Sequence, residues 1–271
     1  MHNHAHHSTN SFAIDGVVTQ LILSIPFIIA FVLYILAVVI SNKRHKKWPK
    51  YRVALFTVGI FLAVVSVAGP LATQAHKDFT AHMVGHLFLG MLAPLLIALS
   101  APMTLLLRLL HVRQAREISK LLKSWPARII TNPVFTSIIN IGGLWLLYTT
   151  NLFSTMHENL FLYLFIHFHI FIAGYLFTIS MIYIDPIAHR VSYLYRAITL
   201  LLALAGHAIL SKYIYANSPN GVLREEAELG GMLMYYGGDI IDSVIIFILC
   251  LHWYKAYRPR GNVAIGHHHE S

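Results

Sequence analysis

The sequence predicts an all-α integral membrane protein, arranged as a bundle of seven transmembrane helices. Hydrophobic residues make up 57% of its 271 residues and charged residues only 11%, against roughly 45–50% and about 25% in soluble domains. Apolar runs, each long enough to cross a bilayer once, recur along the chain. These runs fall near residues 17–40, 52–73, 79–107, 128–150, 158–184, 194–216 and 231–254.

The distribution of Lys and Arg predicts the orientation of the bundle. Because basic loops are retained in the cytoplasm, the side that holds most of them is the inner side. We therefore expect the N-terminus outside and the C-terminus in the cytoplasm, and we assign the net charge of +9 to topology, with no role in nucleic-acid binding. Six basic residues lie around 41–52, six in 108–128, two in 185–196 and three after 254, whereas only Lys77, Lys212 and Arg224 lie on the other side.

The individual runs carry the signs of packed membrane helices. The first contains no charged residue, and no basic region with an adjoining apolar run precedes it, so we expect an uncleaved helix and no signal peptide. The second and fourth carry small and polar residues at helical spacing, which is typical of close helix packing. The third, from Asp78 to Arg108, contains Pro94, which predicts a bend. The basic loop 109–127 predicts a short helix on the membrane surface.

We expect one domain, residues 17–256, between a histidine-rich extracellular tail, residues 1–16, and a cytoplasmic tail, residues 257–271. The tail histidines are typical of a loose metal collector, but also of an expression tag or a featureless tail, so no function is assigned to them. Cys250 is the only cysteine. This excludes an intramolecular disulfide and a Cys-x-x-Cys redox or metal motif.

Ionisable side chains in five places inside the apolar runs predict a functional site. His82 and His86 lie four residues apart, so they share one helix face and can bind one ion. From the helical rise, His86 lies about 10 Å, and His167, His207 and Asp239 about 14 Å, from the outer ends of their helices. An ionisable group at such depth is costly, which makes this shared layer a candidate site.

The spacing on two helices predicts which residues face inward. His167 shares a stripe with Tyr163 and Gly174, which favours it over His169. On the last helix Asp239 and Asp242 share a polar face with Tyr235. A metal site accounts for the layer better than separate hydrogen bonds, although a structural pairing of Asp239 with Lys212 or Arg196 is the alternative for that carboxylate.

Residue chemistry limits the metal. Histidine and carboxylate suit zinc, iron or Cu(II), and thioethers favour Cu(I). Thioethers lie on the outer side of the predicted helices, so copper is preferred and zinc is the alternative. The methionines concerned are Met83, Met156, Met232 and Met234.

The run DFTAHMVGHLFLGMLAPLLIALSAP, with HFHIFIAGY, His207 and GGDIID, resembles the CtaG family of assembly factors for caa3-type cytochrome c oxidases. The resemblance implies a multi-pass protein of the bacterial plasma membrane that supports formation of the copper centre of oxidase subunit I. It implies subunit I, and a copper donor protein, as partners. The family's most specific motif maps onto Asp78, His82, His86 and Pro94. The predicted ligands are His82, His86, His167, His207 and Asp239, supported by Asp78, Asp242 and Tyr235.

We therefore expect a non-enzymatic assembly factor. The first alternative is a seven-helix zinc hydrolase, in which three histidines hold zinc and Asp239 or Asp242 activates water. A b-type haem protein and a proton-coupled transporter are further alternatives, because intramembrane His and Asp serve in both.

Overall fold

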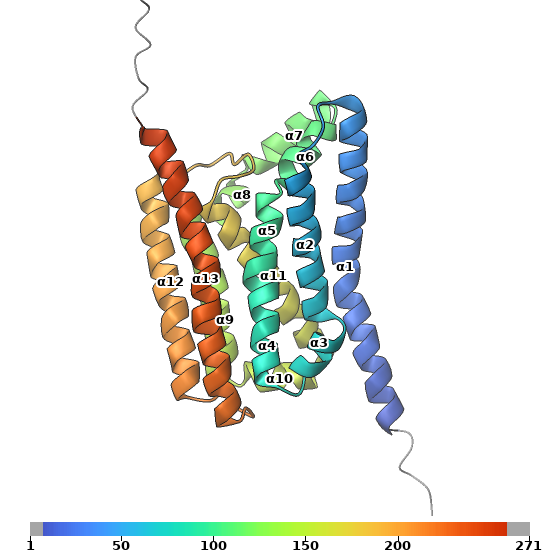
Figure 1. Ribbon diagram of the computed structural model, residues 1–271, viewed down its shortest axis with the longest axis vertical. Helices are drawn as coiled ribbons and strands as arrows, with labels where there is room; N and C mark the ends of the chain where they lie inside the picture. The colour runs from blue at the N-terminus through green and yellow to red at the C-terminus, as the bar shows by residue number, and fades with distance from the viewer. Residues whose placement is uncertain (1–7, 259–271) are drawn as a thin grey trace, which may run out of the picture.

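The computed structural model describes residues 8–258, and over this part of the chain it is all-helical, with the long helices running side by side (Figure 1). Residues 1–7 and 259–271, which hold much of the two predicted tails, lie outside the described residues. In chain order the elements are α1 Ser8–Arg44, α2 Lys50–Val67, α3 Pro70–Ala75, α4 Phe79–His86, the π-helix η1 Leu87–Leu92, α5 Ala93–Leu99, α6 Pro102–Leu109, α7 Val112–Leu122, α8 Trp125–Ile130, α9 Pro133–Thr149, α10 Leu152–Glu158, α11 Leu160–Met181, α12 Tyr193–Ala216 and α13 Arg224–Tyr257.

Six helical stretches of the described residues are long and apolar enough to cross a membrane. They agree with six of the seven predicted runs. The remaining run, 128–150, forms α9, whose 17 residues extend only about 25 Å, short of a hydrocarbon core of about 30 Å. The six stretches are Gly16–Arg44, Lys50–Val67, Phe79–Leu99, Leu160–Met181, Tyr193–Ala216 and Arg224–Tyr257.

The predicted third span, 79–107, is shorter than expected. Its helix stops at Leu99, and Ala101 adopts a left-handed conformation with φ 55°, after which α6 begins as a separate helix at Pro102. The second run is interrupted in the same way, since Gly69 has φ 89° and Pro70 starts α3. In both places the residue before a proline leaves the right-handed helical region, and the proline starts the next helix, where its missing N–H is not needed.

Pro94, at which the sequence predicts a bend, is accompanied by a change in the hydrogen bonding of the third span. Proline has no N–H to donate to the Gly90 carbonyl four residues earlier. The helix accommodates this by a π-turn, in which the Ala93 N–H donates to Phe88 O. The π-helix begins directly after His86. Such turns are rare in proteins and occur frequently at functional sites.

The connections richest in basic residues gather at one end of the bundle. In Figure 1 the C-terminal ends of α1 and α13 lie at the top, together with α6, α7 and α8, whereas α3, α10 and the start of α13 lie at the bottom. The predicted surface helix in the loop 109–127 is present as α7. This common end is the one that the charge pattern assigns to the cytoplasm.

Candidate metal centre

His86, at the end of α4, is the central side chain of the site. It is 5% exposed, and neither Nδ1 nor Nε2 has a hydrogen-bond partner. A buried nitrogen without a partner is costly, so native proteins rarely keep one. Two small cavities meet at this imidazole, one on the side of α12 and α13 and one on the side of α11.

The first cavity joins His86 to His207 of α12 and Asp242 of α13. Its volume is about 20 Å³, which is room for one water-sized species. His207 is 3% and Asp242 5% exposed, and Nε2 of His207 is also without a partner. Asn140 and Thr178 add polar groups to the cavity wall. A carboxylate, two imidazoles and further oxygen donors therefore line one enclosed space.

A glycine of α13 makes room for His207. A Cβ at Gly238 would lie 2.6 Å from Cε1 of the His207 ring. Gly238 and Asp242 are four residues apart and so share one helix face. The face of α13 that receives the imidazole is therefore the face that presents the buried carboxylate.

The second cavity, of about 10 Å³, is lined by His82, His86 and His167. Nε2 of His82 lies 3.1 Å from the Tyr148 hydroxyl, and Nδ1 of His167 lies 2.9 Å from the Tyr163 carbonyl oxygen. In His167 the Nδ1–H donates to that carbonyl, which leaves Nε2 as an acceptor or ligand. All four predicted histidines thus lie at one or both of two adjoining cavities.

The structure corrects the placement of Asp239. This residue is exposed on α13, whereas Asp242 is buried. The buried stripe of α13 runs through Gly231, Gly238 and Asp242, and Asp239 is rotated from it by about 100° relative to Gly238 and about 60° relative to Asp242. Among the described residues Asp239 forms no salt bridge with Lys212, whose ammonium lies 5.1 Å from the Tyr235 ring centroid.

Asp78 and Tyr235, the other predicted supporting residues, lie apart from the two cavities. Asp78 caps α4, since its carboxylate accepts the Thr80 N–H at 2.8 Å. Tyr235 is half-buried and carries the contact with Lys212. Both therefore have structural roles in this arrangement.

The histidines do not converge on one point. Among residues 8–258 no three His, Cys, Asp or Glu side chains lie close enough together to hold a metal ion. The ring centroids of His86 and His207 are 6.4 Å apart, whereas two imidazoles bound to one ion about 2 Å away have centroids roughly 5–6 Å apart. The two rings would therefore have to move closer for both to bind one ion.

Three aromatic or imidazole groups around the site were not predicted from the sequence. Tyr148, which contacts His82, is buried on α9, and its signal was the apolar stripe that it shares with Leu144. His76 and His157 lie at the end of the bundle that holds α3 and α10, with their ring centroids 5.7 Å apart. Burial, and then the nearby His157, lower the pKa of His76 below its ordinary value. No spacing rule connects these two residues, because His76 directly follows α3 and His157 lies in the last turn of α10, far away in the sequence.

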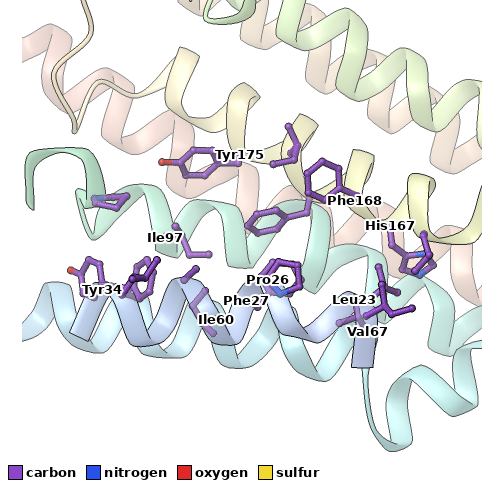
Figure 2. A pocket seen from close by; sticks show the side chains of 18 of the residues that line it. Leu23, Pro26, Phe27, Tyr34, Ile60, Val67, Ile97, His167, Phe168 and Tyr175 are labelled. Carbon is purple, nitrogen blue, oxygen red and sulfur yellow. The ribbon is translucent and has the colours of Figure 1, made fainter. Parts of the chain in front are cut away.

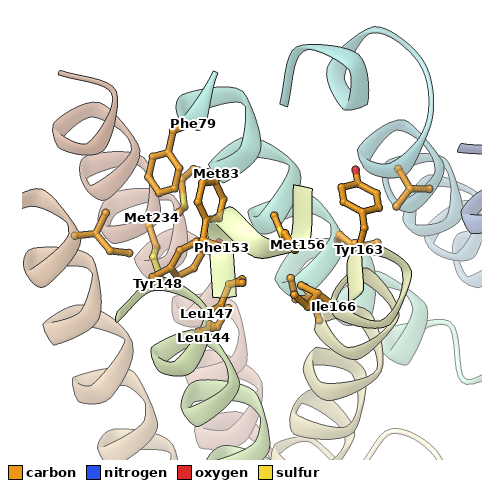
Figure 3. Packing of buried hydrophobic residues seen from close by; sticks show 14 of the residues in the cluster. Phe79, Met83, Leu144, Leu147, Tyr148, Phe153, Met156, Tyr163, Ile166 and Met234 are labelled. Atoms are coloured by element: carbon orange, nitrogen blue, oxygen red, sulfur yellow. The ribbon is translucent and has the colours of Figure 1, made fainter. Parts of the chain in front are cut away.

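The predicted thioether donors are mostly core residues. Met83, Met156 and Met234 are fully buried and pack with Phe79, Tyr148 and Phe153 in the cluster that Figure 3 shows. Met232 is exposed. This packing is the ordinary role of methionine as an adaptable apolar side chain.

Comparison with known proteins assigns the chain to a family. The family profile described as Cytochrome c oxidase caa3 assembly factor (Caa3_CtaG) matches residues 32–256, which include every described site residue named above. The chain belongs to this family. The predicted family is thereby confirmed, and the match gives no support to the alternative of a zinc hydrolase. The family membership also agrees with a bacterial membrane protein that associates with cytochrome c oxidase.

The curated relatives are longer mycobacterial proteins. An uncharacterised protein of Mycobacterium leprae is 28% identical over 256 residues, which are 87% of this chain and 38% of the relative. An uncharacterised protein of Mycobacterium bovis is 29% identical over 174 residues, 62% of this chain and 26% of the relative. The chain therefore spans less than half the length of these relatives. No solved structure is significantly similar to it.

Proposed function

We propose that this member of the caa3 oxidase assembly factors supports formation of the copper centre of oxidase subunit I by holding a copper ion, as cargo, inside the membrane. His86, His207 and Asp242 form the holding site, and His82 and His167 line the adjoining cavity. One observation carries the proposal. Three imidazole nitrogens of His86 and His207 are buried without partners beside a buried carboxylate.

The energetics explain why an ion is the fitting occupant. Each buried polar atom without a partner costs about 1–3 kcal/mol, which coordination to an ion offsets. Asp242 supplies negative charge, since a carboxylate in an apolar cavity also needs a cation or donors. The nitrogen and oxygen donor set suits Cu(II) and zinc, and the family's role in oxidase assembly favours copper.

The chain's own residues would perform three tasks. His82 and His167 offer imidazoles between the outer end of the bundle and His86. Tyr148 holds the His82 ring by its hydrogen bond, which limits the ring's rotation. His86 and His207 would approach one another to share an ion, since their ring centroids are 6.4 Å apart.

The proposal includes a topology. α9 is the seventh membrane span. Its 17 residues lie among the longer helices, and the helices before and after it, α8 and α10, lie toward opposite ends of the bundle (Figure 1). The basic end faces the cytoplasm, so the site lies in the outer half of a bacterial plasma membrane. From there the ion would pass from a copper donor protein to subunit I.

The decisive test is the metal content of the client. In a strain lacking this protein, purified oxidase should retain its haems but lack copper at the haem–copper centre. Complementation with the wild type should restore copper, whereas His86→Ala should not. His169→Ala is a suitable control, because His169 lies on α11 but packs against Gly143 of α9. Full copper occupancy in the deletion strain would refute the proposal.

A further inference from the structure

A long apolar groove separates α1 from α11. It has a volume of about 770 Å³ and is lined by α1, α2, α5, α6 and α11. Its wall is almost entirely apolar, and small side chains at Ala30 and Ala37 of α1 widen it. Figure 2 shows the lining side chains, with Tyr34 at one end and His167 at the other. The groove therefore extends along the helices over much of their length.

A pair of arginines stands at the Tyr34 end of the groove. Tyr34 stacks on Phe56 with centroids 3.8 Å apart, and its hydroxyl accepts the Trp48 Nε1–H at 3.1 Å. The guanidinium groups of Arg52 and Arg108 lie 5.0 and 5.7 Å from the Trp48 ring centroid. Two positive charges are thus fixed around one indole at the basic end of the bundle.

These charges are not neutralised by the part of the chain that the structure describes. Neither arginine forms a salt bridge with a described carboxylate. Asp185, at the same end, is engaged elsewhere, because it accepts the backbone N–H groups of Met103 and Thr104 and the Thr104 hydroxyl. Arg52 donates to the Tyr51 hydroxyl and Arg108 to the Lys46 carbonyl oxygen, both neutral acceptors. The two guanidinium groups are therefore available to an anionic ligand at this end of the groove.

The chemistry of the groove selects the occupant. Its wall along α1 and α11 is apolar and two arginines lie beside its Tyr34 end, so the occupant combines an apolar chain with an anionic group. A flexible acyl chain fits such a narrow apolar space, and the arginines fit a phosphate. We propose that the groove binds one anionic phospholipid of the inner leaflet, with an acyl chain between α1 and α11 and its headgroup at Arg52 and Arg108.

This lipid would have a consequence for the histidines. His167 lines both the groove and the cavity that it shares with His82 and His86. An acyl chain in the groove would cover the side of His167 that otherwise faces the bilayer. An ion could then reach the histidines only from the outer end of the bundle. The lipid site itself does not depend on the proposed copper function, since it rests on other residues.

Native mass spectrometry of the purified full chain tests the proposal. The protein is reconstituted into nanodiscs that contain equal amounts of phosphatidylglycerol and phosphatidylcholine. It is then released from the nanodiscs in the mass spectrometer, and the lipid that stays bound to it is identified. The wild type should retain one phosphatidylglycerol. The double variant Arg52→Gln, Arg108→Gln should lose this preference by on the order of tenfold, and Ala30→Phe, which fills the groove, should abolish retention of either lipid.

A charge-matched control separates this site from the general attraction of a basic surface. Arg113→Gln with Arg116→Gln removes two exposed charges from α7, at the same end of the bundle, and should leave retention unchanged. Equal retention of both lipids by the wild type, or equal losses in the two double variants, would overturn the proposal. If Ala30→Phe does not fold, the two arginine double variants still decide between these outcomes.

Discussion

His86 of α4 and His207 of α12 face one another inside the bundle with ring centroids 6.4 Å apart and planes inclined by 31°. They are separated by 121 positions in the sequence, from 86 to 207. Together with Asp242 they line one cavity. The environment of the two imidazoles is thus created by the packing of α4, α12 and α13.

The carboxylate of the site is predicted to be Asp242. Asp242→Asn should lower the copper affinity of the purified protein by about 10–100-fold, because it removes the buried negative charge beside His86 and His207. Asp239→Asn should have little effect, because Asp239 is exposed. Metal titration of both variants measures this, and the reverse ranking would restore Asp239 as the ligand.

Gly238→Ala tests the seat of the His207 ring. The added Cβ would lie 2.6 Å from Cε1, so the imidazole must move. We expect destabilisation of about 1–3 kcal/mol and copper affinity lowered by on the order of tenfold, both measurable on purified protein. Gly142→Ala on α9 is the matched control, since its Cβ would have no atom within 4 Å. Equal effects of the two substitutions would contradict this explanation.

Lys212 is predicted to act independently of Asp239. Its ammonium lies over the Tyr235 ring at 5.1 Å, an interaction worth about 0.5–1 kcal/mol at an exposed position. Lys212→Met should therefore reduce stability slightly, and its effect should add to that of Asp239→Asn in the double variant. Thermal unfolding of the three variants provides the measurement. Relief of destabilisation in the double variant would instead establish an ion pair.

The lowered pKa of His76, which directly follows α3, predicts that the stability of the protein depends on pH. Burial, followed by repulsion from His157, lowers the pKa of His76 below its ordinary value of 6.5. The unfolded chain therefore binds a proton at a higher pH than the folded protein does, so stability falls as pH decreases through 6.5 and levels off below the folded pKa. His76→Gln should flatten this part of the curve of stability against pH. Thermal unfolding between about pH 7.5 and 5, a range that includes the ordinary histidine pKa, measures this. An unchanged slope would show that other groups are responsible.

The sequence predicted the helices better than their breaks. Six of the predicted spans are present because a long apolar run has few alternatives to a helix in lipid. The end of the third span at Leu99, and the left-handed Ala101 that follows it, were missed because hydropathy continues unchanged to Leu107. Only the φ angle of one residue separates α5 from α6.

The sequence by itself determined that the protein is a membrane helix bundle, which family it resembles, and that its third, fifth, sixth and seventh predicted helices carry buried ionisable groups. These are properties of local composition and of motif spacing. The tertiary structure decided which carboxylate meets the histidines, because this depends on the rotation of α13 about its axis. That rotation follows from close contacts such as Gly238 against His207, and from Gly231 against the Ser211 carbonyl. Since three residues leave Asp239 and Asp242 only about 60° apart around the helix, they could be distinguished only once those contacts were known.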